Sequence, residues 1–207
     1  MSGKFTFQEE KSMSSLEKYE WDRVWYEDTH DKDSIRVAYI GDSISCATYE
    51  VANSMPDRKF LFSNFATSKA LDNPYLYTSL RLFLDQNTGI DVIVINNGLH
   101  GFHLDSKKYS ELYLELIRKL SSDYPGVPVV IALTTAVSSE KCVADEILVR
   151  NEKALEIAKT EGLEVIDLYS VALENIGLLT DGVHFKHEGY VALANKIIDR
   201  VNEILGL

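Results

Sequence analysis

Cysteine and proline are scarce in this chain, with two cysteines and four prolines among 207 residues. Cys46 and Cys142 form no CxxC pair, and no cysteine–histidine spacing typical of a zinc site is present. A chain of this length buries a substantial core without covalent cross-links. We therefore expect neither a disulfide framework nor structural zinc, and we interpret both cysteines as buried or unreactive thiols.

Positive charge is also in short supply, because 21 basic residues stand against 32 acidic ones and the net charge is −11. Such a surface repels phosphate groups, which argues against nucleic acid and anionic membranes as partners. No apolar run approaches the length of a membrane span, and the residues after Met1 lack the pattern of a signal peptide. The sequence therefore predicts a cytoplasmic protein.

Apolar runs alternate with helical patterns along most of the chain, without internal repeats or a break in composition. Residues 1–34 form a polar, acidic and aromatic arm, and residues 35–207 form one domain. The runs predict strands at 36–40, 59–63, 91–96, 127–134 and 163–168, and helices at 44–54, 73–86, 105–122, 145–161 and 187–205. This order predicts an α/β fold with three layers, in which helices cover both faces of a five-stranded parallel sheet.

The carboxyl ends of the strands are where such sheets place their sites. Gly41-Asp42-Ser43 follows the first predicted strand and opens a helix. A serine there lies beside the positive end of the helix dipole, and its backbone N–H is free to bind an oxyanion. The alternative interpretation is a helix N-cap without catalysis.

Asp181-Gly-Val-His184 lies on a predicted loop before the last helix. An aspartate three residues before a histidine can bind Nδ1 of the ring and leave Nε2 facing outward, as a catalytic base requires. The alternative is a loop aspartate that caps the last helix beside a surface histidine. The position of the pair favours the catalytic interpretation, because the last predicted strand ends on the same edge of the sheet as Ser43.

These two motifs resemble the first and last sequence blocks of the SGNH (GDSL-type) hydrolases. Among the members of that family, the chain is similar to bacterial carbohydrate acetylesterases. The resemblance implies a flavodoxin-like fold over residues 35–207. It also implies that Ser43 is the nucleophile, that His184 is the general base and later the acid, and that Asp181 orients His184. No metal or organic cofactor is implied.

The two middle blocks of the family are altered in this sequence. The oxyanion hole implied by the resemblance uses the N–H of Ser43 and of a glycine, whose place is taken here by Ala66 in Asn64-Phe-Ala-Thr-Ser-Lys69. The third block normally ends in Gly-x-Asn-Asp. With Gly98 aligned, His100 stands at the asparagine position, so it is one candidate for the third donor. Asn97 or Asn96, just before the turn, is the other.

Several further side chains are candidates for weaker roles. Asp42, Asn64, Ser68 and Trp25 are candidates for substrate binding. The aromatic cluster Trp21, Trp25 and Tyr26 either packs the arm onto the domain or lines the rim of the cleft, where it would suit a carbohydrate. His100 and His103 lack a partner at metal-ligand spacing, so no metal site is predicted. We interpret Lys69, Arg150 and Asn151 as solvated surface residues.

The expected function is hydrolysis of a short-chain, acetyl-type ester through an acyl-enzyme, with a carbohydrate as the expected alcohol. One alternative is a lysophospholipase or thioesterase that acts on longer acyl chains. Another is a carbohydrate-binding module that keeps the fold without catalysis, which the altered middle blocks make plausible.

Overall fold

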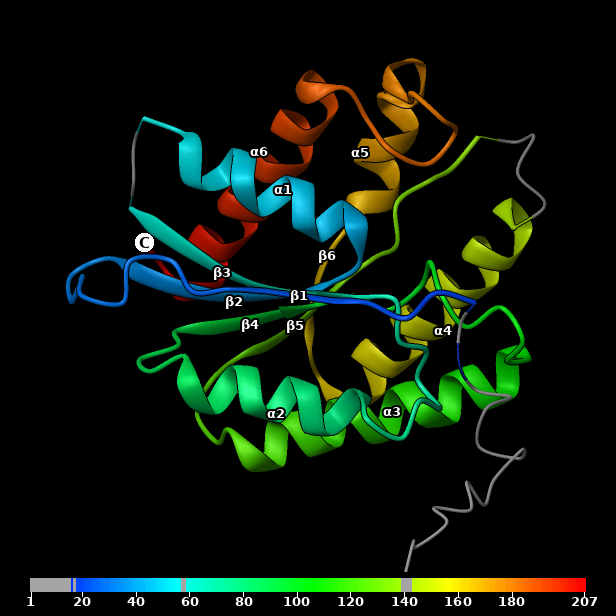
Figure 1. Ribbon diagram of the computed structural model, residues 1–207, viewed down its shortest axis with the longest axis horizontal. Helices are drawn as coiled ribbons and strands as arrows, with labels where there is room; N and C mark the ends of the chain where they lie inside the picture. The colour runs from blue at the N-terminus through cyan, green and yellow to red at the C-terminus, as the bar shows by residue number, and fades with distance from the viewer. Residues whose placement is uncertain (1–15, 17, 57–58, 139–142) are drawn as a thin grey trace, which may run out of the picture.

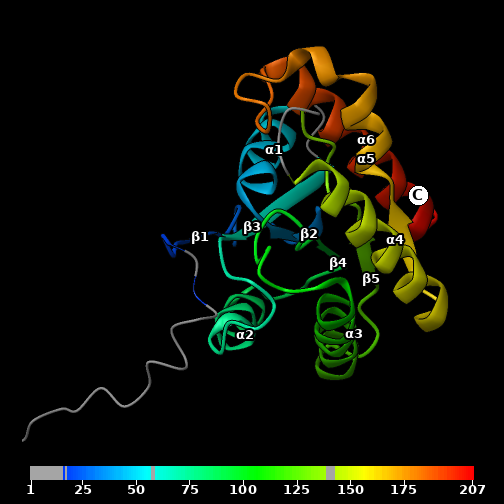
Figure 2. The same cartoon turned by 90° about the vertical axis from the view of Figure 1, so that its right-hand side faces the viewer.

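A computed structural model describes residues 16, 18–56, 59–138 and 143–207. In this part of the chain a six-stranded sheet lies between two layers of helices, with α1, α5 and α6 on one face and α2, α3 and α4 on the other (Figures 1 and 2). The strands are β1 (Asp22–Trp25), β2 (Ile35–Gly41), β3 (Phe60–Thr67), β4 (Val92–Ile95), β5 (Val129–Ala132) and β6 (Glu164–Ile166). The helices are α1 (Ser43–Ser54), α2 (Leu76–Gln86), α3 (Ser106–Asp123), α4 (Ala144–Glu161), α5 (Leu168–Glu174) and α6 (His187–Leu205), with a 3₁₀ turn at Ile176–Leu178.

The strand order is β1-β3-β2-β4-β5-β6, and all pairs are parallel except β1 with β3. The five parallel strands follow the flavodoxin-like order, in which the first strand of the unit lies inside the sheet. The α/β fold with three layers is thereby confirmed. The order reverses beside β2, so the carboxyl end of β2 is the place where this topology opens a crevice.

Strand β2 shows why the apolar runs are continuous. Val37 and Tyr39 face the core beneath α1 and α6, whereas Ala38 and Ile40 face the core beneath α2 and α3. All four are buried, because helices cover both faces of the sheet. The helices contribute one apolar stripe each, as α3 does with Tyr109, Tyr113, Leu116, Ile117 and Leu120.

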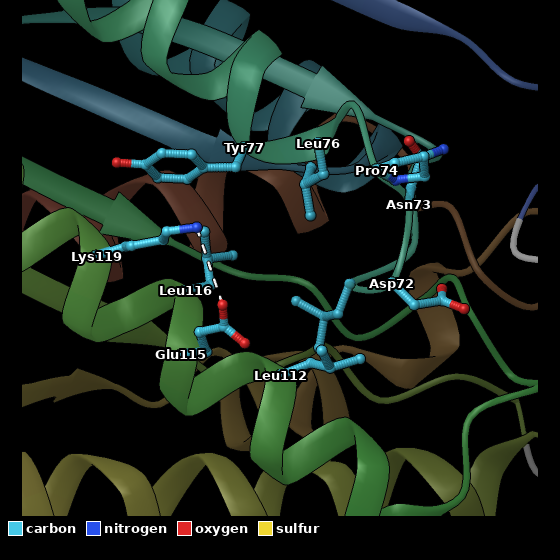
Figure 3. A pocket seen from close by; sticks show the side chains of 10 residues that line it. Asp72, Asn73, Pro74, Leu76, Tyr77, Leu112, Glu115, Leu116 and Lys119 are labelled. Carbon is cyan, nitrogen blue, oxygen red and sulfur yellow. Dashed lines mark ion pairs between the residues drawn. The ribbon is translucent and has the colours of Figure 1, made fainter. Parts of the chain in front are cut away.

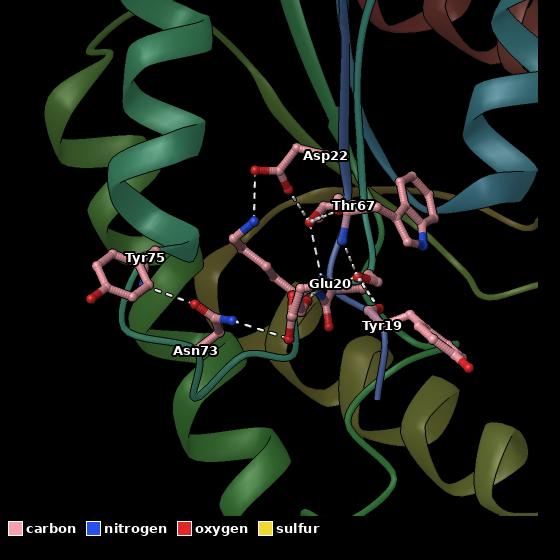
Figure 4. A network of polar contacts seen from close by, with 10 residues as sticks. Tyr19, Glu20, Asp22, Thr67, Asn73 and Tyr75 are labelled. Atoms are coloured by element: carbon pink, nitrogen blue, oxygen red, sulfur yellow. Dashed lines mark hydrogen bonds and ion pairs between the residues drawn. The ribbon is translucent and has the colours of Figure 1, made fainter. Parts of the chain in front are cut away.

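The N-terminal arm adds an edge strand that the sequence did not predict. Strand β1 pairs antiparallel with β3, so the sheet has six strands instead of five. Asp22 anchors it, because its carboxylate accepts a hydrogen bond from Thr67 Oγ1 (2.6 Å) and pairs with Lys69 Nζ (2.6 Å), as Figure 4 shows. The strand is short, and its residues carry both charge and aromatic rings, so no regular alternation marks it in the sequence.

Helix α5 is a second element without a predicted counterpart. Asp167 begins it, because its carboxylate accepts hydrogen bonds from the N–H (2.9 Å) and Oγ (2.6 Å) of Ser170. The predicted strand at 163–168 extends into this helix, because the apolar residues of both elements run together. Cys142 lies outside the described residues. Among the helices of the described ranges, none is long and apolar enough to cross a membrane.

Candidate active site

Ser43, His184 and Asp181 form one hydrogen-bonded chain at the carboxyl edge of the sheet. Ser43 Oγ lies 2.8 Å from His184 Nε2, and His184 Nδ1 lies 2.8 Å from Asp181 Oδ2. Ser43 comes directly after β2, and the other two precede α6, so the pairing joins segments 141 residues apart. Both ring nitrogens of His184 are therefore engaged in the manner of a serine, histidine and aspartate triad.

The start of α1 fixes the position of Ser43. Asp42 is the N-cap residue, and its carboxylate accepts a hydrogen bond from the Ile44 N–H (2.8 Å). Ser43 is thus the first helical residue, whose N–H has no carbonyl partner within the helix. Burial raises the pKa of the Asp42 carboxyl, while the nearby His100 and His184 act in the opposite direction.

The loop that carries Asp181 and His184 is held mostly by its own short-range hydrogen bonds, together with one from the Ser138 N–H to the Gly182 carbonyl (2.8 Å). Asp181 Oδ1 accepts from the N–H groups of Val183 (2.9 Å) and His184 (2.8 Å), while Thr180 N–H donates to the His184 carbonyl (2.8 Å). The hydrogen bonds from the His184 N–H and ring and from Val183 hold the pKa of Asp181 well below its ordinary value. The carboxylate is largely exposed and stays charged. It therefore accepts the Nδ1–H of His184, which fixes this tautomer.

The loop at 96–101 follows β4, the strand next to β2, and it is held from two helices. Arg150 of α4 is fully buried, and its guanidinium donates to the carbonyls of Gly98 (3.1 Å), His100 (2.5 Å) and Gly101 (2.7 Å). The rings of Phe102 and Tyr109 lie 4.3 and 4.7 Å from this cation. The interpretation of Arg150 as a solvated surface residue is therefore wrong.

Two glycines allow the loop to adopt this path. A Cβ on Gly98 would lie 1.8 Å from Thr134 Oγ1, which leaves no room for a side chain. Gly101 has φ +71°, and a Cβ there would lie 2.7 Å from the Ala70 Cβ. The Tyr109 hydroxyl also donates to the Asn97 carbonyl (2.9 Å), so the backbone around His100 is fixed on several sides.

Ala66 lies inside the sheet, which corrects the expectation that its N–H faces an oxyanion. The Ser68 N–H donates to the Trp21 carbonyl (3.1 Å), and hydrogen-bonded pairs alternate along an antiparallel ladder. Ala66 and its partner Arg23 are the next such pair, so the Ala66 N–H points at β1. Ala66, at the position of the glycine in the resembled sequence block, therefore directs its N–H into the β1–β3 ladder.

The two asparagines before the turn make contacts within the protein. Asn96 Nδ2 donates to the Ala132 carbonyl (2.8 Å) and to Thr134 Oγ1 (2.9 Å), which uses both amide hydrogens. Asn97 Nδ2 donates to the Lys69 carbonyl (3.0 Å) and ties the loop to the segment after β3. His100 is half-buried, with its ring 6.3 Å from that of Trp21. His100 follows β4, which pairs with β2, so its loop lies at the same edge of the sheet as Ser43, while the amides of Asn96 and Asn97 donate within the protein.

Three of the four candidates for substrate binding have structural roles. Asp42 caps α1 from a buried position, as described above. Asn64 is fully buried, and its amide donates to the Tyr39 carbonyl (2.9 Å) and to Ser45 Oγ (3.2 Å). Ser68 is buried and accepts a hydrogen bond from the Trp21 N–H (2.9 Å). Trp25, by contrast, is 49% exposed on the edge strand.

The remaining polar candidates are paired within the fold. His103 Nε2 lies 2.9 Å from an Asp72 carboxylate oxygen. Asn151 is buried and makes two hydrogen bonds to the backbone of Thr134, so it is no surface residue. Across the described ranges, no group of three or more histidine, cysteine, aspartate or glutamate residues could hold a metal ion.

A separate groove of about 290 Å³ lies between α2 and α3 (Figure 3). Its floor contains Leu76, Leu112 and Leu116, and a Glu115–Lys119 ion pair (3.9 Å) stands on one wall. The groove opens on the face of the sheet opposite to α1, and none of the three triad residues lines it. The arrangement of chemical groups, more than the size of a cavity, therefore identifies the site.

Comparisons with known proteins find the same fold. No protein-family model matches the chain, and neither does any curated protein. Similar solved structures include a member of the lipolytic protein G-D-S-L family from Veillonella parvula, at 18% identity and TM-score 0.65, covering 80% of this chain and 97% of that one. An acetyl xylan esterase has 20% identity and TM-score 0.63, with 81% of this chain and 100% of that one covered.

A third neighbour is a putative acylhydrolase from Bacteroides fragilis, with 19% identity and TM-score 0.63 over 87% of this chain and 91% of that one. At these identities the comparisons establish the architecture. The chain has the fold of the SGNH (GDSL-type) hydrolases, and its structural neighbours are GDSL-type lipolytic proteins and acetyl xylan esterases.

Proposed function

We propose that this protein is a serine esterase in which Ser43 is the nucleophile, His184 the general base and Asp181 the residue that orients it. One observation carries the proposal, namely the continuous hydrogen-bonded chain from Asp181 through His184 to Ser43 at the carboxyl edge of the sheet. A structural N-cap explains Asp42, but it does not explain why the histidine of a distant loop binds the hydroxyl of the next residue.

The reaction proceeds in two steps through an acyl-enzyme. His184 Nε2 takes the proton of the Ser43 hydroxyl as Oγ attacks the ester carbonyl, and the imidazolium then protonates the leaving alcohol. A water molecule then loses its proton to His184 and attacks the acyl group, and the imidazolium returns that proton to Ser43 Oγ as the acyl–oxygen bond breaks, which releases the acid and restores the hydroxyl. Asp181 stabilises the imidazolium in both steps and remains ionised throughout.

The oxyanion of each tetrahedral intermediate is bound by the Ser43 N–H and by an N–H of the His100 ring. The Ser43 N–H opens α1, where the helix dipole favours negative charge. His100 stands on the loop that Arg150 fixes, so its position is set before the substrate arrives.

The substrate we propose is a short-chain, acetyl-type ester of a carbohydrate. None of the grooves of more than about 200 Å³ found among the described residues is lined by Ser43 or His184, so the nucleophile has no long apolar channel beside it, which favours a short acyl group. His184 and Asp181 are exposed, so a bulky alcohol can reach them from solvent. Acetyl xylan esterases among the structural neighbours share the fold, which supports the same choice.

Hydrolysis of p-nitrophenyl esters of increasing acyl length tests the proposal. We expect turnover to be highest with acetate, and Ser43→Ala to lower kcat by about 10⁴-fold or more. Ser121→Ala, at an exposed serine of α3, serves as the matched control and should retain full activity. Equal rates for wild type and Ser43→Ala at every acyl length would refute the esterase and favour a binding module. A preference for long chains would favour a lysophospholipase or thioesterase.

A further inference from the structure

The edge strand β1 presents a row of three large side chains on one side. Successive side chains of a strand point to opposite faces, so Trp21, Arg23 and Trp25 share the side that faces α1. Trp21 precedes β1 and continues its ladder, because it exchanges hydrogen bonds with the backbone N–H and side chain of Ser68 (3.1 and 2.9 Å). The row therefore has a fixed backbone along its whole length.

One end of this row reaches the candidate active site. The ring of Trp21 meets that of His100 edge to face, with centroids 6.3 Å apart and an interplanar angle of 80°. Trp21 is half-buried, so it forms a wall beside the oxyanion-binding residue proposed above.

The middle of the row binds the helix that carries the nucleophile. Arg23 donates to Glu50 Oε1 (2.5 Å) and to Cys46 Sγ (2.8 Å), and its guanidinium lies 6.0 Å from the centre of the Tyr49 ring. Ser43, Cys46 and Glu50 follow one another at helical spacing along α1. Seven residues of helix measure about 10 Å, which is the distance along α1 from the nucleophile to Glu50.

The far end of the row is an exposed indole in a shallow groove. Trp25 is 49% exposed, and its Nε1 donates to Glu27 Oε2 (2.8 Å), which fixes the orientation of the ring. The groove measures about 310 Å³ and is lined by Arg23, Trp25, Glu27, Tyr49, Glu50, Asn53 and Ser54. Aromatic faces thus alternate with carboxylate, guanidinium and amide groups along this surface.

We propose that this groove between β1 and α1 binds the chain of a neutral oligosaccharide, while a sugar further along carries the ester at Ser43. A sugar ring offers an apolar face that stacks on an indole, and its rim of hydroxyl groups bonds to carboxylates and guanidinium groups. The protein's net charge of −11 disfavours an anionic polymer or a phospholipid headgroup in the same place. The position of the esterified sugar rests on the esterase proposal for Ser43. Binding of the oligosaccharide in the groove does not depend on that proposal.

The test compares esters of one alcohol class at two lengths. We expect wild type to have a higher kcat/KM on chemically acetylated oligosaccharides than on the acetylated monosaccharide. Trp25→Ala should raise KM for the oligosaccharide about tenfold beyond any change with the monosaccharide, since loss of one stacking partner has this magnitude. Trp25→Phe should recover part of the loss. Tyr75→Ala removes an exposed aromatic ring from the beginning of α2 and should leave both substrates unaffected.

Two outcomes would overturn the inference and leave the esterase standing: equal KM values for wild type and Trp25→Ala on the oligosaccharide, or equal losses on both substrates. If no ester is hydrolysed, the esterase proposal fails. Calorimetric titration with the unacetylated oligosaccharide then tests binding in the groove independently of catalysis. Heat of binding that Trp25→Ala abolishes would support the groove, whereas no heat with wild type would refute it.

Discussion

The two loops that flank Ser43 are built in different ways. The base loop, residues 180–185, is largely solvent-accessible apart from the buried Phe185, and most of its hydrogen bonds join its own residues, with one from the Ser138 N–H to the Gly182 carbonyl (2.8 Å). The donor loop, residues 96–101, is held by Arg150, which lies 49 to 52 positions further along the chain and is fully buried. One side of the site therefore depends mainly on local spacing, and the other depends on the packing of the domain.

This difference explains which parts of the site a sequence reveals. Asp181 and His184 meet because three residues separate them, and the same short loop brings the backbone N–H of His184 to the carboxylate. The role of Arg150 depends on the position of α4 relative to β4, which no spacing along the chain encodes. The only signal in the sequence is an arginine within an amphipathic helix, and this signal does not distinguish a buried guanidinium from a solvated one.

The largest effect is expected from Asp181→Asn, which tests the base loop. The amide cannot stabilise the imidazolium and permits the wrong tautomer of His184, so we expect kcat on p-nitrophenyl acetate to fall by about 10⁴-fold. The fold should be retained, because the side chain is exposed and its contacts are local. Steady-state kinetics and a thermal melt measure the two quantities. A loss under tenfold would show that Asp181 does not orient the base.

Acid unfolding of the same variant supplies a control that concerns stability alone. The pKa of Asp181 is lowered by folding, so its charge stabilises the native state above the usual aspartate pKa. This contribution is lost as the pH falls through the lowered pKa. The difference in free energy of unfolding between wild type and Asp181→Asn should be small at neutral pH, because solvent screens an exposed carboxylate, and should vanish in strong acid. A difference that grows in acid would contradict the assignment.

A smaller effect is expected from His100→Ala, which tests the donor loop. Loss of one oxyanion donor lowers kcat by about 10²- to 10³-fold. KM should change little, because this interaction strengthens only when the carbonyl oxygen becomes charged. His100→Asn restores an N–H donor and should recover part of the rate, whereas unchanged kcat in His100→Ala would remove His100 from the oxyanion hole.

Much of the fold follows from local patterns. The helix predicted at 187–205 has the bounds of α6, and the run at 36–40 lies within β2, because one-sided and two-sided burial leave different periodicities. Strand β1 carries no such local pattern, because the residues of β3 that pair with it lie 39 to 45 positions away along the chain. Ala66 shows the same limit, since only the antiparallel neighbour directs its N–H into the ladder.

The smallest catalytic effect is expected from Arg150→Lys, which separates the positioning of the donor loop from its chemistry. Lysine keeps the charge but lacks the planar fork that reaches three carbonyls, so His100 should lose part of its fixed position. We expect kcat to fall about tenfold with KM unchanged, and the free energy of unfolding to fall by about 3 kcal/mol. Kinetics and urea unfolding measure both quantities.

The decisive comparison is the same substitution in a His100→Ala background. If Arg150 acts on the rate through His100, Arg150→Lys should leave kcat of that variant nearly unchanged, while the loss of stability remains. Equal losses of kcat in both backgrounds would show that the two residues act independently. The effect of Arg150 on kcat would then not pass through His100 or the loop at 96–101.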